Sequence, residues 1–150
     1  MAGDSVLKAE KVTRKFGGLT AVNRVDFELP AGSICSIIGP NGAGKTTLFN
    51  MIAGLCPPTS GSILMGKTAL AHGHGKKMRC LPAYQIARLG IGRTFQNIRL
   101  FAAMTVLENV LIGTHALKIA EPAAVQKALS GLELVGLRDK GNELARNLPY

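Results

Sequence analysis

The chain has 150 residues, of which 47% are apolar, and a formal net charge of +9, which predicts one folded domain with a sizeable core. No apolar run approaches the roughly 20 residues that a membrane-spanning helix needs, and the N-terminal residues lack the basic and apolar regions of a secretion signal. Three widely spaced cysteines without a C-x-x-C pair argue against a disulfide framework, so we expect a cytoplasmic protein.

The first forty residues predict three strands. Residues 6–16 (VLKAEKVTRKF) alternate moderately and end at a Gly17-Gly18 turn. Residues 21–30 (AVNRVDFELP) place apolar side chains on one face of a second strand. Residues 34–38 (ICSII) are almost wholly apolar, which is typical of a strand that is buried on both faces.

The middle of the chain predicts two helices and one strand. A helix is expected from about Lys45 to Leu55, where the CPPTSG segment stops it. A short strand follows at residues 62–65, and the polar, glycine-containing residues 66–80 predict an exposed loop. Residues 82–90 (PAYQIARLG) predict a short helix. Residues 91–97 (IGRTFQN) are then expected to return toward the core.

The last third of the chain predicts helices. Thr105 and Glu108 fit a capping box before an apolar run. Residues 121–137 have helical spacing, and Pro122 suits a first helical turn. The apolar face predicted for this second helix consists of Val125, Leu129, Leu132 and Val135.

The composition changes near residue 97 and divides the chain into residues 1–96, strand-rich and basic, and residues 97–150, helical and balanced in charge. No Asp or Glu occurs between Glu28 and Glu108, a stretch that holds eight lysines and arginines. Such a positive region suits a nucleotide, a nucleic acid or acidic lipid headgroups. The alternative interpretation is a solvated basic surface.

A glycine-rich loop precedes the helix predicted at Lys45. Residues 39–47 (GPNGAGKTT) contain the pattern G-x-x-x-x-G-K-[ST], between a predicted strand and a predicted helix. Its glycines let successive backbone N–H groups point at phosphate oxygens, and the start of the helix adds further donors. A tight glycine turn without a ligand is the alternative.

The residue types in this loop indicate a nucleoside triphosphate and Mg²⁺. Lys45 can bind the β- and γ-phosphates, Thr46 offers a hydroxyl to Mg²⁺, and Thr47 can reach the α-phosphate. The expected nucleotide-binding residues of the loop are Gly39, Pro40, Asn41, Gly42, Ala43, Gly44, Lys45, Thr46 and Thr47.

The segment GPNGAGKTTLFNMIAGL resembles the Walker A region of ATP-binding cassette (ABC) ATPases. Phe16, in VTRKFGG, stands where that family places an aromatic residue that stacks on adenine, although alone it would be interpreted as core. Gln96, in RTFQN, matches the family's Q-loop glutamine. The resemblance implies ATP as the nucleotide, catalytic roles for Lys45 and Gln96, and a metal site at Thr46 and Gln96.

The resemblance also implies the fold and a subfamily. An α/β P-loop NTPase core with an antiparallel β subdomain and a helical subdomain is expected. The stretch LPAYQIARLGIGRTFQNIRLFAAMTVLENVLIG is similar to LivG-type ATPases of branched-chain amino acid importers. It implies a peripheral protein on the cytoplasmic face of the cell membrane. Its partners would be transmembrane permease subunits, a second ATPase subunit and, indirectly, a solute-binding protein; nucleic acid is not expected.

Two departures from the subfamily leave alternatives open. The loop at residues 68–80 is longer than expected, and the helical stretch between Gly113 and Val125 is shorter. ATPases of related importers, for urea or another small solute, share much of the pattern. A non-transport ABC nucleotide-binding module, as in DNA repair or translation, and a generic P-loop NTPase are the remaining alternatives.

The sequence contains no apolar run that ends in Asp-Glu, where the family places its Walker B aspartate and catalytic glutamate. The family's signature motif would begin at Tyr150, and its switch histidine would follow. We therefore expect a part of a longer ATPase, truncated before the signature motif. Residues 1–150 alone are expected to bind ATP without hydrolysing it.

A metal site drawn from His72, His74 and Cys80 is a weaker hypothesis. Their spacing is not a standard zinc pattern and a fourth ligand is missing, so an exposed loop is the preferred interpretation.

Overall fold

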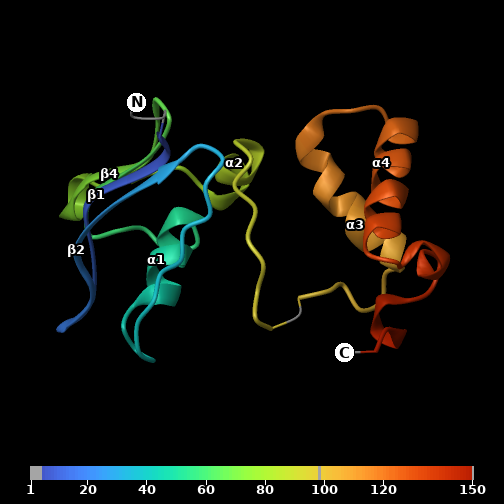
Figure 1. Cartoon of the computed structure of the whole chain (residues 1–150), viewed down its shortest axis with the longest axis horizontal. Helices are drawn as coiled ribbons and strands as arrows, with labels where there is room; N and C mark the ends of the chain where they lie inside the picture. The colour runs from blue at the N-terminus through green and yellow to red at the C-terminus, as the bar shows by residue number, and fades with distance from the viewer. Residues whose placement is uncertain (1–4, 98, 150) are drawn as a thin grey trace. The chain divides into compact units, whose positions relative to one another are not determined.

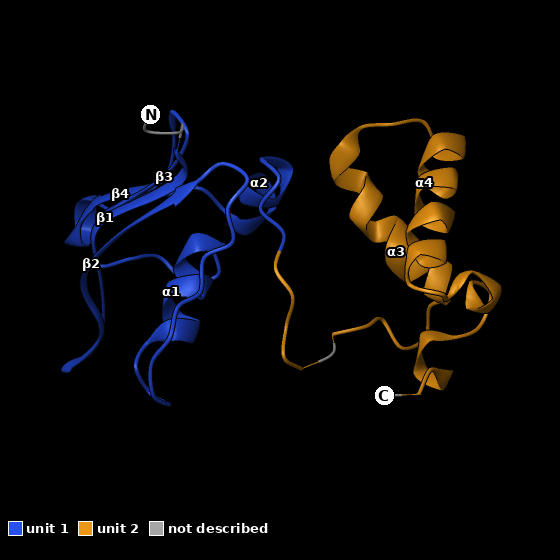
Figure 2. Cartoon of the chain, viewed as in Figure 1, with its two compact units in different colours: residues 1–92 blue, residues 93–150 orange. Residues whose placement is uncertain are grey.

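A computed structural model describes residues 5–97 and 99–149 of the chain (Figure 1). The chain divides into two compact units, residues 1–92 (unit 1) and residues 93–150 (unit 2), and each is described by itself (Figure 2). None of the helices in the described ranges has the length and hydropathy required to span a bilayer.

Unit 1 is built on a five-stranded antiparallel sheet with the strand order β2-β1-β3-β4-β5. The strands are β1 (Ser5–Phe16), β2 (Leu19–Pro30), β3 (Ser60–Met65), β4 (Thr68–His74) and β5 (Arg79–Cys80). A turn at Gly17, with a φ of 56°, closes the hairpin of β1 and β2. The strands predicted at residues 6–16, 21–30 and 62–65 are confirmed.

The prediction of an exposed loop over residues 66–80 is wrong. Met65 pairs with Thr68, so Gly66 and Lys67 form a two-residue turn, and Gly66 takes the positive φ of 53° that such turns require. The 3₁₀ helix η1 (Gly75–Lys77) then connects β4 to β5. The segment is a strand because Leu70 and Ala71 are buried in the core, although its glycines and histidines favour a loop on composition alone.

Residues 34–38 form no strand, contrary to the prediction. The side chains of Ile34 and Ile38 are 98% and 93% exposed. A strand requires a neighbour that accepts and donates its backbone hydrogen bonds, and none of the described strands pairs with this segment. Its apolar composition is therefore not sufficient to make it a strand.

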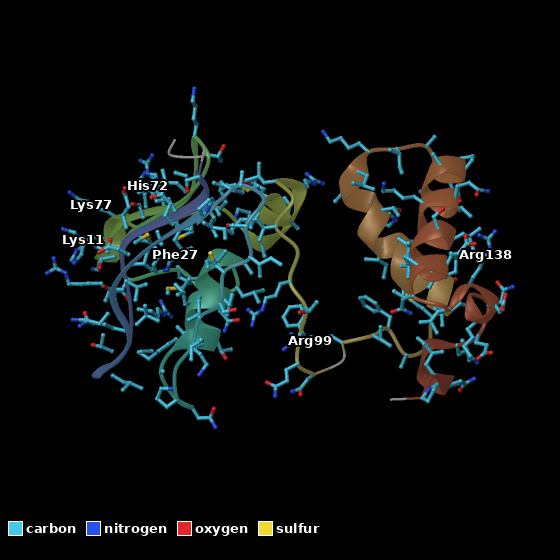
Figure 3. All side chains as sticks on the ribbon, in the orientation of Figure 1. Lys11, Phe27, His72, Lys77, Arg99 and Arg138 are labelled. Atoms are coloured by element: carbon cyan, nitrogen blue, oxygen red, sulfur yellow. The ribbon has the colours of Figure 1, made fainter. Side chains whose placement is uncertain are left out.

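The core of unit 1 lies between the sheet and two helices, α1 (Lys45–Ile52) and α2 (Ala83–Arg88), which confirm the helices predicted there (Figure 1). Phe27 of β2 packs against this core from the side that faces α1 (Figure 3). Ile91 also packs against it, whereas the rest of residues 91–97 has no regular structure. The largest fully buried side chains are Val12, Met51, Ile63, Leu70 and Ile86.

Unit 2 is a helical hairpin in which α3 (Val106–Thr114) packs against α4 (Glu121–Leu134) (Figure 1). Both helices confirm the helical prediction for this part of the chain. The short helices are η2 (His115–Leu117), η3 (Arg138–Lys140) and η4 (Ala145–Asn147). The chain returns past the start of α3, where the backbone N–H of Val106 donates to the carbonyl oxygen of Glu143 at 2.9 Å.

The buried face of α4 agrees with the predicted one only at Leu132. Val135 is 66% exposed, and Val125 and Leu129 are only half-buried. The fully buried positions are spaced four residues apart: Ala124, Ala128 and Leu132. Two of these side chains are alanines, which allow α3 and α4 to approach closely, so the contact face follows small residues rather than large ones.

The capping box predicted at the start of α3 is confirmed. The backbone N–H of Thr105 donates to a carboxylate oxygen of Glu108 at 2.7 Å, and the N–H of Glu108 donates to the Thr105 hydroxyl at 3.2 Å. The Thr105 backbone, followed by its hydroxyl, lowers the pKa of Glu108 below its ordinary value of 4.5.

This capping box predicts an acid-sensitive contribution to stability. Because the folded-state pKa is lowered, the contribution is fully present above about 4.5 and is lost as the pH falls through the lowered value. We expect wild type to melt at a higher temperature than Glu108→Gln at neutral pH, and the difference to vanish in acid. Circular dichroism melts measure it, and Glu121→Gln, in the first turn of α4, is the control. A difference that grows in acid would contradict the argument.

Candidate phosphate-binding site

The phosphate-loop pattern lies in the structure between residue 38 and the first turn of α1. Gly44 is the N-cap of this helix, and the N–H of Leu48 donates to its carbonyl oxygen at 2.9 Å. The loop itself turns through a hydrogen bond from the N–H of Ala43 to the carbonyl oxygen of Pro40 at 3.2 Å. Residues 39–43 are exposed, so the loop backbone is accessible to a ligand.

Gly44 is required at its position for two reasons. Its φ is 84°, in the left-handed region that L-residues rarely adopt. A Cβ atom there would lie 2.1 Å from the carbonyl oxygen of Ala21 and 3.2 Å from a methyl carbon of Val22. The loop therefore rests on β2 at this point, which fixes the start of α1. Gly42 has the same φ of 84°, but a Cβ there would meet open space.

The ammonium group of Lys45 is held by the loop that precedes it. Its Nζ donates to the carbonyl oxygens of Gly39 at 2.6 Å and Pro40 at 2.7 Å. Among the described residues no carboxylate forms an ion pair with it. The positive charge is thus balanced by backbone dipoles alone, at a helix N-terminus that also favours an anion. This arrangement can bind a phosphate group.

The two threonines that follow Lys45 lie in the first turn of α1. Thr46 is exposed, and Thr47 is partly buried. Their side chains start at the same helix end as the loop, which is where a phosphate chain and its Mg²⁺ would lie. The position of Thr46 thus fits a magnesium ligand, although the helix alone does not select the metal.

Phe16, at the end of β1, is 47% exposed, and it is not part of the buried core. The Arg14 guanidinium carbon lies 4.4 Å from the centroid of its ring, a cation–π contact. Arg14 is itself anchored by a hydrogen bond to the carbonyl oxygen of Pro57 at 2.8 Å. The ring is therefore oriented by a neighbour while part of its surface stays accessible for stacking.

The strand register relates Phe16 to the phosphate loop. Phe16 pairs with Leu19, and Ala21, two residues further along β2, is the residue against which Gly44 rests. Two residues of a strand span roughly 7 Å. The aromatic ring and the loop thus lie at the same end of the hairpin, within the reach of one nucleotide.

Gln96 belongs to unit 2, where it is exposed and outside any helix or strand. Phe95 beside it has two arginines near its ring, with the guanidinium carbons of Arg93 and Arg99 at 5.2 Å and 5.0 Å from the centroid (Figure 3). Phe95 is not among the site residues predicted from the sequence. Its signal was an aromatic residue between two basic residues in RTFQNIR.

Leu100 and Phe101, which follow Gln96 in the sequence, are exposed. Leu100 is 48% and Phe101 58% exposed, so neither belongs to the buried core of unit 2. Asn109 of α3 binds the backbone of Phe101 twice: it accepts from the Phe101 N–H at 2.9 Å and donates to its carbonyl oxygen at 3.1 Å. Asn109 thus fixes the position of Phe101, a role that sequence reasoning missed.

The histidines and cysteine of the metal hypothesis lie on two strands, His72 and His74 on β4 and Cys80 on β5. In Figure 3, His72 lies on the outer side of the sheet, as does Lys77. No group of three or more potential metal ligands occurs within the described ranges.

Comparison with known protein families agrees with the loop geometry. The family model for ABC transporters matches residues 22–148, which include the phosphate loop, Gln96 and most of unit 2. The chain is 40% identical over 160 residues to the high-affinity branched-chain amino acid transport ATP-binding protein LivG of Escherichia coli (strain K12). That match covers 97% of this chain and 60% of LivG.

Two further relatives are also named as ATP-binding proteins of transport or import. BraF of Pseudomonas aeruginosa, a high-affinity branched-chain amino acid transport ATP-binding protein, is 38% identical over 97% of this chain and 60% of BraF. The Fe(3+) ions import ATP-binding protein FbpC of Brucella abortus (strain 2308) is 38% identical over 93% of this chain and 36% of FbpC. The chain thus spans about 60% of the length of LivG and BraF.

Solved structures agree with the fold. The ADP conformation of MJ1267, an ATP-binding cassette of an ABC transporter, superposes with a TM-score of 0.75 at 28% identity, over 97% of this chain and 59% of that chain. The dimeric post-hydrolysis state of the ATP-binding cassette MJ0796, bound to ADP and Pi, superposes with a TM-score of 0.75 at 25% identity. That match covers 95% of this chain and 63% of the MJ0796 chain. The predicted fold class is confirmed, an α/β ATPase cassette with an antiparallel sheet and a helical unit.

Proposed function

Because the chain belongs to the ABC transporter family of ATP-binding proteins, we propose that it is part of the ATP-binding subunit of an importer. The observation that carries this proposal is Lys45, a cation that has no carboxylate partner among the described residues and is held by loop carbonyls at the N-terminus of α1. In this function residues 39–47 wrap the phosphates of ATP, and Phe16 stacks on the adenine. Mg²⁺, when bound, neutralises phosphate charge; Thr46 and Gln96 would hold it.

Hydrolysis belongs to the whole ATPase in this proposal. Lys45 stabilises charge on the phosphates and Gln96 positions the attacking water. No carboxylate occurs between Glu28 and Glu108, and the sequence contains no Asp-Glu pair after an apolar run. Residues 1–150 alone should therefore bind ATP without turning it over.

The proposed cargo is a branched-chain amino acid. LivG and BraF, which are 38–40% identical over 97% of this chain, are both named as branched-chain amino acid transport proteins. FbpC, named for Fe(3+) import, matches at 38% over a smaller share, so ferric iron is the competing cargo, besides urea or another small solute. The subunit would bind permeases at the cytoplasmic face of the membrane and pair with a second ATPase subunit, while a solute-binding protein delivers the cargo.

A chimera tests this proposal. Residues 1–150 replace the matching three-fifths of Escherichia coli LivG in a strain without LivG, and uptake of radiolabelled leucine is measured. We expect leucine uptake with the chimera and none with its Lys45→Ala version. An assay of ATP binding by the chain separates two failures: bound ATP without uptake argues against the cargo or the permease partner, and absent ATP binding argues against the phosphate site.

Phe16→Ala should weaken nucleotide binding by about tenfold or more, since base–aromatic stacking is worth roughly 1–3 kcal/mol. Phe16→Tyr should bind as wild type does, because either ring offers a stacking face. Titration with a fluorescent ATP analogue measures both. Wild-type affinity in the alanine variant would show that Phe16 only supports Arg14 and the end of β1.

Leu100 and Phe101 are proposed to contact the permease, because they are large exposed apolar side chains next to Gln96. Phe101→Glu should reduce leucine uptake by the chimera while ATP binding and the melting temperature stay unchanged. Leu134→Glu is the matched control, since Leu134 is 88% exposed on α4. A similar loss of uptake in both variants would argue against a specific contact.

A further inference from the structure

A half-open surface cavity of about 420 Å³ lies in unit 2, where the end of α3 passes through η2 into the start of α4 (Figure 1). Four of the residues that line it are exposed: His115, Lys118, Ile119 and Glu121. Its volume is in the lower part of the range for small-molecule sites, which is roughly 300–1,000 Å³. All of its lining residues come from this one helical connection: Leu111, Thr114, His115, Lys118, Ile119, Glu121 and Ala124. None of these residues belongs to the phosphate loop.

Three ionisable side chains of both signs line this cavity. His115 and Lys118 precede Glu121 along the chain, and none of the three forms an ion pair or a side-chain hydrogen bond within the described residues. Elsewhere in unit 2 opposite charges do pair, as Arg138 does with Glu133 at 2.7 Å. The cavity thus offers a cationic and an anionic group that remain available to a ligand.

Lys118 has a strained backbone, with a φ of 50° and a ψ of 40° in the left-handed region. Only three non-glycine residues in the described ranges have a positive φ, and Lys118 is the one in unit 2. L-residues other than Asn and Asp rarely take this conformation, and strain of this kind collects at ligand sites. The fold thus keeps a lysine at the cavity although asparagine or glycine would fit its backbone better.

The rest of the lining is mainly apolar. Leu111, Ile119 and Ala124 provide aliphatic side chains, and Ala124 is buried. The hydroxyl of Thr114 already donates to the carbonyl oxygen of Leu111 at 2.7 Å. The lining therefore contains aliphatic side chains as well as positive and negative groups.

We propose that this cavity binds a free aliphatic α-amino acid such as leucine. The carboxylate of the ligand pairs with Lys118 and His115, its ammonium group pairs with Glu121, and its side chain packs on Leu111, Ile119 and Ala124. A zwitterion with an aliphatic side chain is the small ligand that uses all three features at once. A simple anion would leave Glu121 unpaired, and an amine would leave Lys118 unpaired. This binding does not depend on the proposed transport function.

Calorimetric titration of the 150-residue chain tests the ligand class. The probes are L-leucine, glycine, which lacks the side chain, 4-methylpentanoate, which lacks the ammonium group, and 3-methylbutylamine, which lacks the carboxylate. We expect leucine to bind, and each analogue to bind about tenfold more weakly or worse, because each loses one contact with a charged group or the apolar wall. No leucine binding, or equal affinity for leucine and any analogue, would overturn the proposal.

Two substitutions test the location. Lys118→Asn removes the charge and suits the left-handed backbone, and Glu121→Gln removes the carboxylate with little change of shape. Each should weaken leucine binding by about tenfold. Lys127→Gln, on α4 but outside the cavity, should leave it unchanged; an equal loss there would overturn the assignment. ATP binding, measured on the same samples, should be unchanged in all three. None of them should melt at a lower temperature than wild type, and Lys118→Asn should melt at an equal or higher one because it relieves the backbone strain, which distinguishes the loss of the site from misfolding.

Discussion

Replacing Lys45 by alanine should weaken ATP binding by about tenfold to a hundredfold and abolish hydrolysis and transport in the chimera. Lys45 is the only full charge in the phosphate loop, and hydrogen bonds to charged groups are worth about 1.5–3 kcal/mol. Lys45→Arg should also fail, because a planar guanidinium does not replace a compact ammonium group between the carbonyls of Gly39 and Pro40.

Lys67→Ala is the matched control for this change. It removes the same charge from the exposed turn between β3 and β4, away from the loop, and should leave nucleotide affinity unchanged. Fluorescent ATP titration at fixed ionic strength measures both variants. Equal losses in the two would mean that the general positive charge of the chain attracts the nucleotide, and that the loop binds none.

Gly44→Ala should destabilise unit 1 by roughly 2–5 kcal/mol, the sum of left-handed strain and overpacking. The new methyl group would lie 2.1 Å from the carbonyl oxygen of Ala21, so either β2 or the start of α1 must move. Because the shift falls at the N-cap of α1, ATP binding should be lost as well.

Gly42→Ala separates the backbone strain from the overpacking. Gly42 has the same φ of 84° but open space around the added methyl group, so only the strain, about 1–2 kcal/mol, should appear. Urea unfolding of both variants gives the comparison. If Gly42→Ala lowered the free energy of unfolding as much as Gly44→Ala does, the contact with Ala21 would contribute nothing to the destabilisation.

Local signals made much of this molecule predictable from its sequence. The phosphate loop, the capping box of Thr105 and Glu108, and Pro122 at the start of α4 each depend on a few adjacent residues. Their geometry follows from backbone chemistry within one turn. The start of α1, the capping box and the start of α4 were confirmed because no distant partner decides them, whereas the ligand of the phosphate loop stays a prediction.

Features that depend on distant partners were the ones missed. Residues 34–38 have the composition of a buried strand, but no described strand pairs with them. Leu70 and Ala71 are buried because pairing with β3 places them against the core. The polar residues around them in the sequence do not predict this burial. At the phosphate loop, Gly44 lies against Ala21, which is 23 residues earlier in the sequence (44 minus 21). No local sequence pattern can predict such a contact.

The two carbonyl contacts of Lys45 have a consequence for the release of a nucleotide. A lysine that is already satisfied by Gly39 and Pro40 must give up these partners to bind a phosphate, so association is an exchange of hydrogen bonds rather than a pure gain. On release the ammonium group returns to the carbonyls at once, and no unpaired charge is left in the empty loop. In the proposed function, that return stabilises the nucleotide-free loop relative to the bound one and so favours release of a bound nucleotide.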